Sequence, residues 1–145
     1  MKKSIKLLTT TSALIAISLI FGFSYIKNTD TLVMSTYFNK GVYKADSPDN
    51  KNPYKNYFYV FYNKTSGHTE DKKHGIGLPF SCMQKKGYVK FKFGGIDEPE
   101  KTFKIKHAKN DTITGYFEDG SLLIFTPVLN VNPDNFDAVE YIKRK

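Results

Sequence analysis

The feature that most constrains the fold is a two-residue alternation of apolar and polar side chains between residues 88 and 127. In the segment 88–93, valine or phenylalanine occupies every second position, and tyrosine or lysine fills the positions between. Successive side chains of a strand point to opposite faces of the sheet, so this pattern indicates a strand with one buried face. The alternation returns at 101–107, and turn signals bound two further strand candidates at 112–117 and 121–126. Asp119-Gly120 is a strong hairpin signal, and we therefore expect a four-stranded antiparallel meander.

Two further patterns predict structure before the meander. Tyr54–Asn63 carries apolar or aromatic side chains at seven of its ten positions, on both faces of the alternation, as in a strand buried on both sides. Thr31–Phe38 and Leu78–Gln84 are weaker strand candidates. The polar, glycine-containing segment Lys64–Gly77 predicts a long loop.

A capping pattern predicts a helix from Asn132 onwards. Asn132 and Pro133 have the residue types of an N-cap and a first helical position, and Phe136, Val139 and Ile142 give one apolar stripe. The whole pattern predicts an α+β fold: an N-terminal hydrophobic export or anchor helix, then a small antiparallel β-sheet or barrel-like domain with one C-terminal helix. The expected core is Phe58, Val60, Val89, Phe91, Phe93, Phe103, Ile105, Phe117, Leu123, Phe125, Phe136 and Val139.

The first 27 residues have the pattern of an export segment. Three lysines precede the uncharged run 7–26, whose 20 residues are about the length that spans a bilayer. One interpretation is an uncleaved anchor, and the other is a signal peptide cleaved near Ser24. The missing Ala-x-Ala motif favours the anchor. We therefore divide the chain into a signal-anchor or signal peptide at 1–27 and an exported β-rich domain at 28–145, in a single-pass membrane protein or, after cleavage, a secreted one.

The charge of the chain limits the partners that it can bind. The formal net charge is +8, and lysine supplies nearly all of it because Arg144 is the single arginine. One arginine gives little capacity for bidentate contacts to bases, and export separates the domain from nucleic acid, so no nucleic acid is expected. The preponderance of lysine over arginine suits a bacterial coding sequence, and the expected setting is a bacterial cell envelope.

Four lysines of the meander form the candidate binding site. Lys90, Lys92, Lys104 and Lys106 occupy the outward positions of two strands that one loop joins, so even-numbered residues should meet across the pair. Like charges opposite or diagonal to each other destabilise a sheet, and a bound anion would relieve the repulsion. The expected partner is an anionic envelope polymer, a lipid or an acidic protein. The alternative is a solvated face that protects the sheet from aggregation.

A second candidate site is the segment His68–His74, which holds two imidazoles and two carboxylates. Such ligands suit zinc, but the spacing matches no zinc signature and two lysines lie between them. Ser81 and Cys82 lack the glycines of a nucleophile elbow. Acid, base and nucleophile are therefore not assembled by a recognised spacing, and the sequence favours a non-enzymatic binding or inhibitory module with no cofactor and no metal. The alternative is an envelope enzyme or metal-binding protein that uses the His68–His74 loop.

Overall fold

The computed structural model describes residues 36–95 and 97–145. The predicted leader at 1–27, with its apolar run and its cleavage position near Ser24, lies outside the described residues. Most of the predicted first strand at 31–38 does so as well, and its last three residues are not in a strand.

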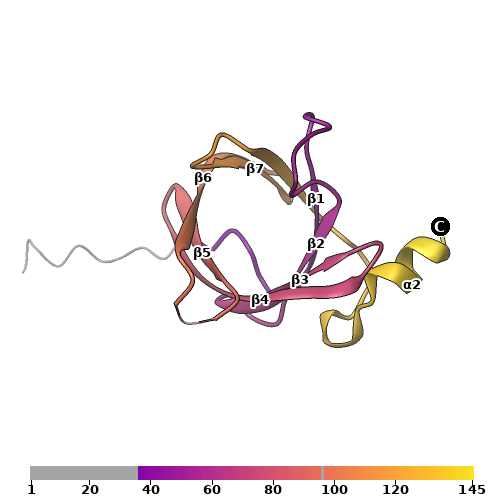
Figure 1. Ribbon diagram of the computed structural model, residues 1–145. Helices are drawn as coiled ribbons and strands as arrows, with labels where there is room; N and C mark the ends of the chain where they lie inside the picture. The colour runs from indigo at the N-terminus through magenta and orange to yellow at the C-terminus, as the bar shows by residue number, and fades with distance from the viewer. Residues whose placement is uncertain (1–35, 96) are drawn as a thin grey trace, which may run out of the picture. The chain divides into compact units, whose positions relative to one another are not determined.

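Eight antiparallel strands form a closed barrel, which Figure 1 shows end-on. Each strand pairs with its neighbour in sequence, and β8 pairs with β1 to close the ring. The strands are β1 Gly41–Asp46, β2 Tyr57–Phe61, β3 Ser66–Asp71, β4 Gly75–Lys85, β5 Tyr88–Phe93, β6 Glu100–Lys109, β7 Thr112–Phe117 and β8 Leu122–Pro127. The predicted meander is confirmed, since it corresponds to β5–β8.

The predicted α+β class is wrong, because the described residues contain almost no helix. A 3₁₀ turn, η1 (Pro133–Asn135), and a six-residue helix, α2 (Ala138–Lys143), take the place of the expected C-terminal helix. Asn132 caps η1 as expected, but Phe136 is extended, with φ −68° and ψ 139°. Asp137 then caps α2. Two caps five residues apart divide the segment, and the extended Phe136 between them prevents one continuous helix.

The predicted loop at 64–77 is also wrong, since most of it belongs to β3 and β4. Four of the six residues of β3 are buried although the strand is polar. The outer side chains His68 and Glu70 bond to each other and lie beneath the C-terminal segment, so their polar groups are satisfied. A polar sequence can form a buried strand when its polar side chains find such partners.

Aromatic rings fill the inside of the barrel. The largest completely buried side chains there are Tyr59, Phe61, Phe91, Phe103 and Phe125. Several of these rings meet edge-to-face, with centroids 4.9–6.4 Å apart, which is the usual packing of aromatic pairs. The barrel interior is therefore a packed core and leaves the outer surface for binding.

The segment that precedes β1 enters this core. Its indigo trace lies inside the ring of strands in Figure 1. Phe38 is completely buried and stacks on Phe61, with 4.8 Å between the ring centroids. The side-chain amide of Gln84 accepts from the backbone nitrogens of Tyr37 and Phe38 and donates to the carbonyl of Phe38. A non-strand segment thus fills the barrel without leaving its backbone groups unpaired.

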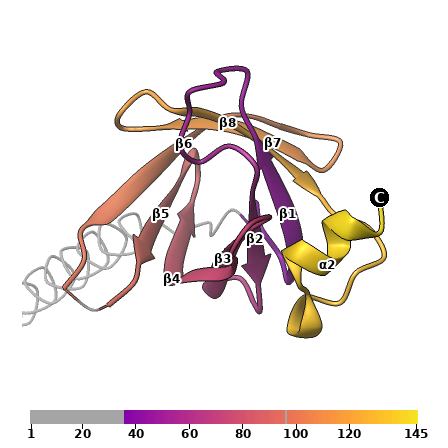
Figure 2. The same cartoon turned by 45° about the vertical axis from the view of Figure 1, so that its right-hand side comes forward.

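A second, smaller core lies on the outside of the barrel. Val42, Phe58 and Val60 point outward from β1 and β2 and are covered by Phe136, Ala138 and Tyr141. Figure 2 shows α2 against the outer side of these strands. Because β2 packs against the lumen on one side and the C-terminal segment on the other, its predicted burial on both faces is confirmed.

The predicted core is confirmed in large part. Eight of its twelve residues are fully buried, and the other four, Phe93, Ile105, Phe136 and Val139, are partly buried. The prediction omitted Phe38, Tyr43, Tyr59, Phe61 and Phe80, which are also buried.

Candidate functional site

The register of β5 and β6 shows which of the four predicted lysines meet. No lysine of β5 lies directly opposite a lysine of β6: the opposed pairs are Lys90–Thr102, Lys92–Glu100 and Lys104–Tyr88. Even-numbered residues pair as predicted, and this register makes Lys90 and Lys104 diagonal neighbours. Lys106 falls at the register shift between β6 and β7.

A shallow groove of about 510 Å³ opens on this outer face. We call it the lysine groove; its polar and aromatic lining consists of Lys86, Tyr88, Lys90, Thr102, Lys104 and Tyr116. Two of the predicted lysines, Lys90 and Lys104, therefore lie in one groove, whereas Lys92 and Lys106 do not line it. Lys86, in the turn between β4 and β5, was missing from the predicted site because only the hairpin geometry brings it beside the two strands.

The charges of the groove are only partly neutralised. The Nζ atom of Lys90 lies 3.2 Å from a carboxylate oxygen of Glu100, in a pair that is about half exposed and therefore weak. Within the described ranges 36–95 and 97–145, neither Lys86 nor Lys104 forms an ion pair. The groove thus presents two ammonium groups that form no ion pair among the described residues and a third in a half-exposed pair with Glu100.

The two histidines of the predicted His68–His74 loop have different surroundings. His68 belongs to β3 and is buried, while His74 lies exposed in the turn to β4 and bonds to Asp71 through Nδ1 at 3.0 Å. Among the described residues, no three histidine, cysteine or acidic side chains are grouped in a way that would hold a metal ion. The structure therefore does not assemble the second predicted site as one ligand set.

His68 is part of a different arrangement, which the sequence analysis missed. Its Nε2 lies 2.7 Å from Glu70 Oε1, and its Nδ1 lies 2.7 Å from the hydroxyl of Tyr62. Glu70 is completely buried, and its second oxygen accepts from the backbone nitrogen of Ala138 at 2.7 Å. The Tyr62 end of this chain of hydrogen bonds lies nearest the surface, because Tyr62 is 44% exposed whereas His68 and Glu70 are buried.

Cys82 is not an activated nucleophile. Its side chain faces the lumen, and its thiol donates to the carbonyl of Lys64 at 3.4 Å. Burial raises the pKa of the thiol to about 12, so it stays protonated and unreactive at neutral pH.

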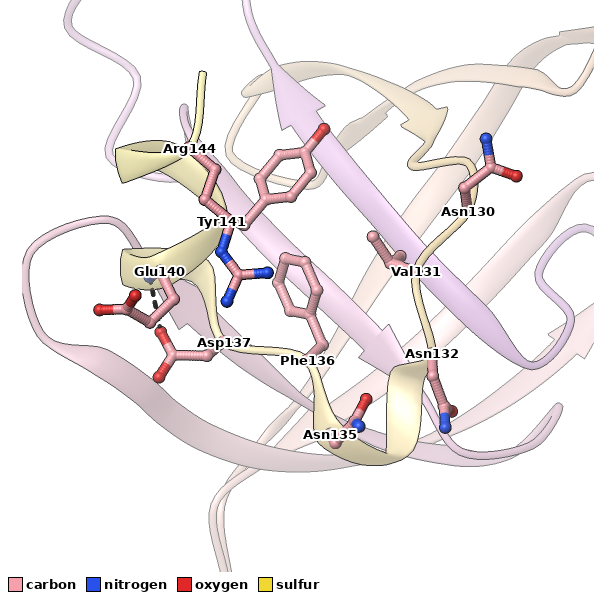
Figure 3. A pocket seen from close by; sticks show the side chains of 9 residues that line it. All are labelled: Asn130, Val131, Asn132, Asn135, Phe136, Asp137, Glu140, Tyr141 and Arg144. Carbon is pink, nitrogen blue, oxygen red and sulfur yellow. Dashed lines mark hydrogen bonds between the residues drawn. The ribbon is translucent and has the colours of Figure 1, made fainter.

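The C-terminal segment forms a second pocket, of about 380 Å³. Figure 3 shows Phe136 and Tyr141 at its centre, with asparagines and charged side chains around them. Its polar groups are largely engaged in local structure, since Asn132 and Asp137 act as caps and Glu140 pairs with Lys143. This pocket is explained by the folding of the C-terminal segment, whereas Lys86 and Lys104 of the lysine groove form no ion pair among the described residues.

Comparison with protein-family models, with curated proteins and with solved structures finds no match for this chain. In the part of the chain that the structure describes, no helix has the length and apolar character needed to cross a membrane.

Proposed function

We propose that the protein is a non-enzymatic, exported binding module that is held at a bacterial cell membrane by residues 7–26 and binds a phosphate-bearing anionic polymer. The observation that most supports this proposal is the lysine groove, where Lys86, Lys90 and Lys104 converge on one outer face of the barrel. The filled interior favours a surface site, because closely packed aromatic rings occupy the lumen.

The chemistry of the groove fits a flexible polyanion better than a small, rigid ligand. Lysine carries a compact, strongly hydrated charge on a flexible stem, and it neutralises phosphates without fixing their orientation. The rings of Tyr88 and Tyr116 add apolar contact area beside the charges. A repeating phosphate polymer can contact several lysines at once while its spacer units lie on the rings.

Binding of a defined polyanion tests the proposal. The full-length chain, in neutral detergent, is titrated with inorganic polyphosphate at several salt concentrations. We expect binding that weakens steeply with salt, since exposed charges are screened over about 8 Å at physiological ionic strength. Replacing Lys86 and Lys104 with glutamine should lower the salt dependence by about one ion per lysine.

The turn between β3 and β4 supplies a matched control. Lys72 and Lys73 are exposed there, and replacing both with glutamine removes the same charge far from the lysine groove. Equal loss of affinity in both double variants would mean that only the net charge attracts the polymer. It would refute the lysine groove as the binding site. Binding to anionic lipid vesicles but not to polyphosphate would reassign the groove to a membrane surface.

The cellular location needs its own experiment. A periplasm- or surface-specific reporter fused after Lys145 should be active, and a reporter that functions only in the cytoplasm should be silent. N-terminal sequencing of the purified protein separates the two forms, because a start at Tyr25 indicates cleavage after Ser24. Activity of the cytoplasmic reporter would refute export.

A further inference from the structure

The hydrogen-bonded chain Tyr62–His68–Glu70 has the order of a nucleophile, a base and a carboxylate. The hydroxyl of Tyr62 and Glu70 Oε1 each lie 2.7 Å from a nitrogen of the same imidazole. In nucleophilic catalysis a hydroxyl is activated by an adjacent base, and a third group orients that base. The three residues meet because β2 and β3 form one hairpin, in which Val60 pairs with His68.

The direction of each hydrogen bond follows from Glu70. As a carboxylate it can only accept, and it already accepts from the backbone nitrogen of Ala138. A neutral His68 therefore donates its Nε2 proton to Glu70, and its Nδ1 accepts from the hydroxyl of Tyr62. Glu70 is completely buried, so water does not compete for its bond from His68.

Anchoring of the C-terminal segment explains only half of this arrangement. The bond from Ala138 to Glu70 fastens that segment to β3, and it needs neither His68 Nδ1 nor Tyr62. The bond from His68 to Tyr62 leads away from the anchor to an exposed phenol. A buried base that bonds to the hydroxyl of an exposed tyrosine is the arrangement of a reactive side chain.

We propose that Tyr62 is an acyl-acceptor site, with His68 as its general base and Glu70 as the residue that positions the imidazole. The phenolic oxygen attacks the carbonyl carbon of an activated acyl donor and forms an ester bond. The bond from that carbon to the leaving group breaks, the phenolic proton passes to Nδ1 of His68, and His68 then protonates the leaving group. No electrons are gained or lost, and His68 and Glu70 end in their starting states.

The acyl donor N-acetylimidazole tests the proposal on the full-length protein. Tyr116 is the internal control, because it is 40% exposed against 44% for Tyr62 and lies on β7. Peptide mass spectrometry gives the acetylation rate at each residue. We expect Tyr62 to react at least about tenfold faster than Tyr116, a conservative value for general-base assistance. Equal or slower reaction at Tyr62 would show that its hydrogen bond only shields the phenol and would overturn the proposal.

Two further measurements assign the effect to His68. In urea, where the hydrogen bonds are lost, the two rates should converge. In H68A the rate at Tyr62 should fall to within about twofold of that at Tyr116, because the general-base contribution is removed, and added imidazole should restore part of it. A persistent excess at Tyr62 in folded H68A, or in urea, would contradict a role for His68. If H68A does not fold, the ratio in the native chain and its loss in urea still decide the outcome.

Discussion

Gln84 binds the backbone of Phe38 through both atoms of its amide: Oε1 accepts from the Phe38 nitrogen and Nε2 donates to the Phe38 carbonyl, each at 2.8 Å. The same amide also bonds to Tyr37 and to Lys64. A single buried side chain therefore satisfies the backbone of a segment that has no strand to pair with. This relationship explains how an irregular segment is stable inside a barrel.

Replacing Gln84 with leucine keeps the volume and removes all four hydrogen bonds. Each buried backbone group left without a partner costs about 1–3 kcal/mol, so we expect a loss of at least about 3 kcal/mol in the free energy of unfolding. Urea denaturation followed by circular dichroism measures it. Q84E keeps an acceptor for the two nitrogens but turns a carboxyl oxygen toward the carbonyls of Phe38 and Lys64, so it should also lower the free energy of unfolding. A Q84L protein as stable as the unmodified chain would show that the segment does not depend on this amide.

Replacing Phe38 with alanine tests the contribution of the ring inside the barrel. Phe38 packs against Phe61 and Phe125, with centroids 4.8 and 5.1 Å away. Truncation of a buried phenylalanine leaves a cavity and typically costs about 3–5 kcal/mol. Calorimetry should show a lower Tm for F38A, and benzene should raise it again by filling the cavity. An unchanged Tm would mean that the segment before β1 contributes nothing to the core.

Gly115 should not tolerate a larger residue. A Cβ atom there would clash with the backbone oxygen of Lys104 and lie 2.7 Å from the ring of Phe103, closer than atoms pack. Overpacking of this kind costs about 1–3 kcal/mol, which G115A should show in urea denaturation. Gly95 is the control, because no atom lies within 4 Å of its added Cβ. Equal stability of G115A and G95A would contradict the close approach.

Cys82 should make stability depend on alkaline pH. Burial raises the pKa of its thiol from 9.0 to about 12, so the folded state holds the proton that the unfolded state releases. This contribution is complete below pH 9 and is lost as the pH rises from 9 to 12, by up to about 1.4 kcal/mol per pH unit. Urea midpoints at pH 8 and pH 10 should therefore differ less in C82A than in the unmodified chain. An equal difference in both would show that the thiol does not contribute.

The sequence predicts the strands whose pattern depends on a single buried face, and it misses those whose burial depends on distant partners. The segment 88–93 is β5 with unchanged bounds, because its alternation records one lumen-facing side. β3 reads as a loop, because the C-terminal segment that buries His68 and Glu70 lies far away in sequence. No local pattern could indicate that cover.

The candidate site was also predictable only in part. The alternation places Lys90 and Lys104 outward, and the even-with-even pairing follows from the short loop between their strands. Predicting the contribution of Lys86 requires the geometry of the β4–β5 hairpin. Predicting the ion pair between Lys90 and Glu100 requires the register of β5 and β6. The bond from Tyr62 to His68 was missed because Tyr62 lies just beyond the end of β2 and His68 lay in a predicted loop.

The pairing of β1 with β8 has a consequence for how the chain is made. Tyr43 pairs with Pro127, so the ring stays open until the last strand has been synthesised, whereas every other strand pairs with its neighbour in sequence. Hairpins of adjacent strands form quickly, but closure brings distant parts of the chain together and is the slow step. Until then the edge of β1 is unpaired and can join other chains. A nascent chain stalled before Leu122 should therefore leave the barrel open, with the edge of β1 unpaired.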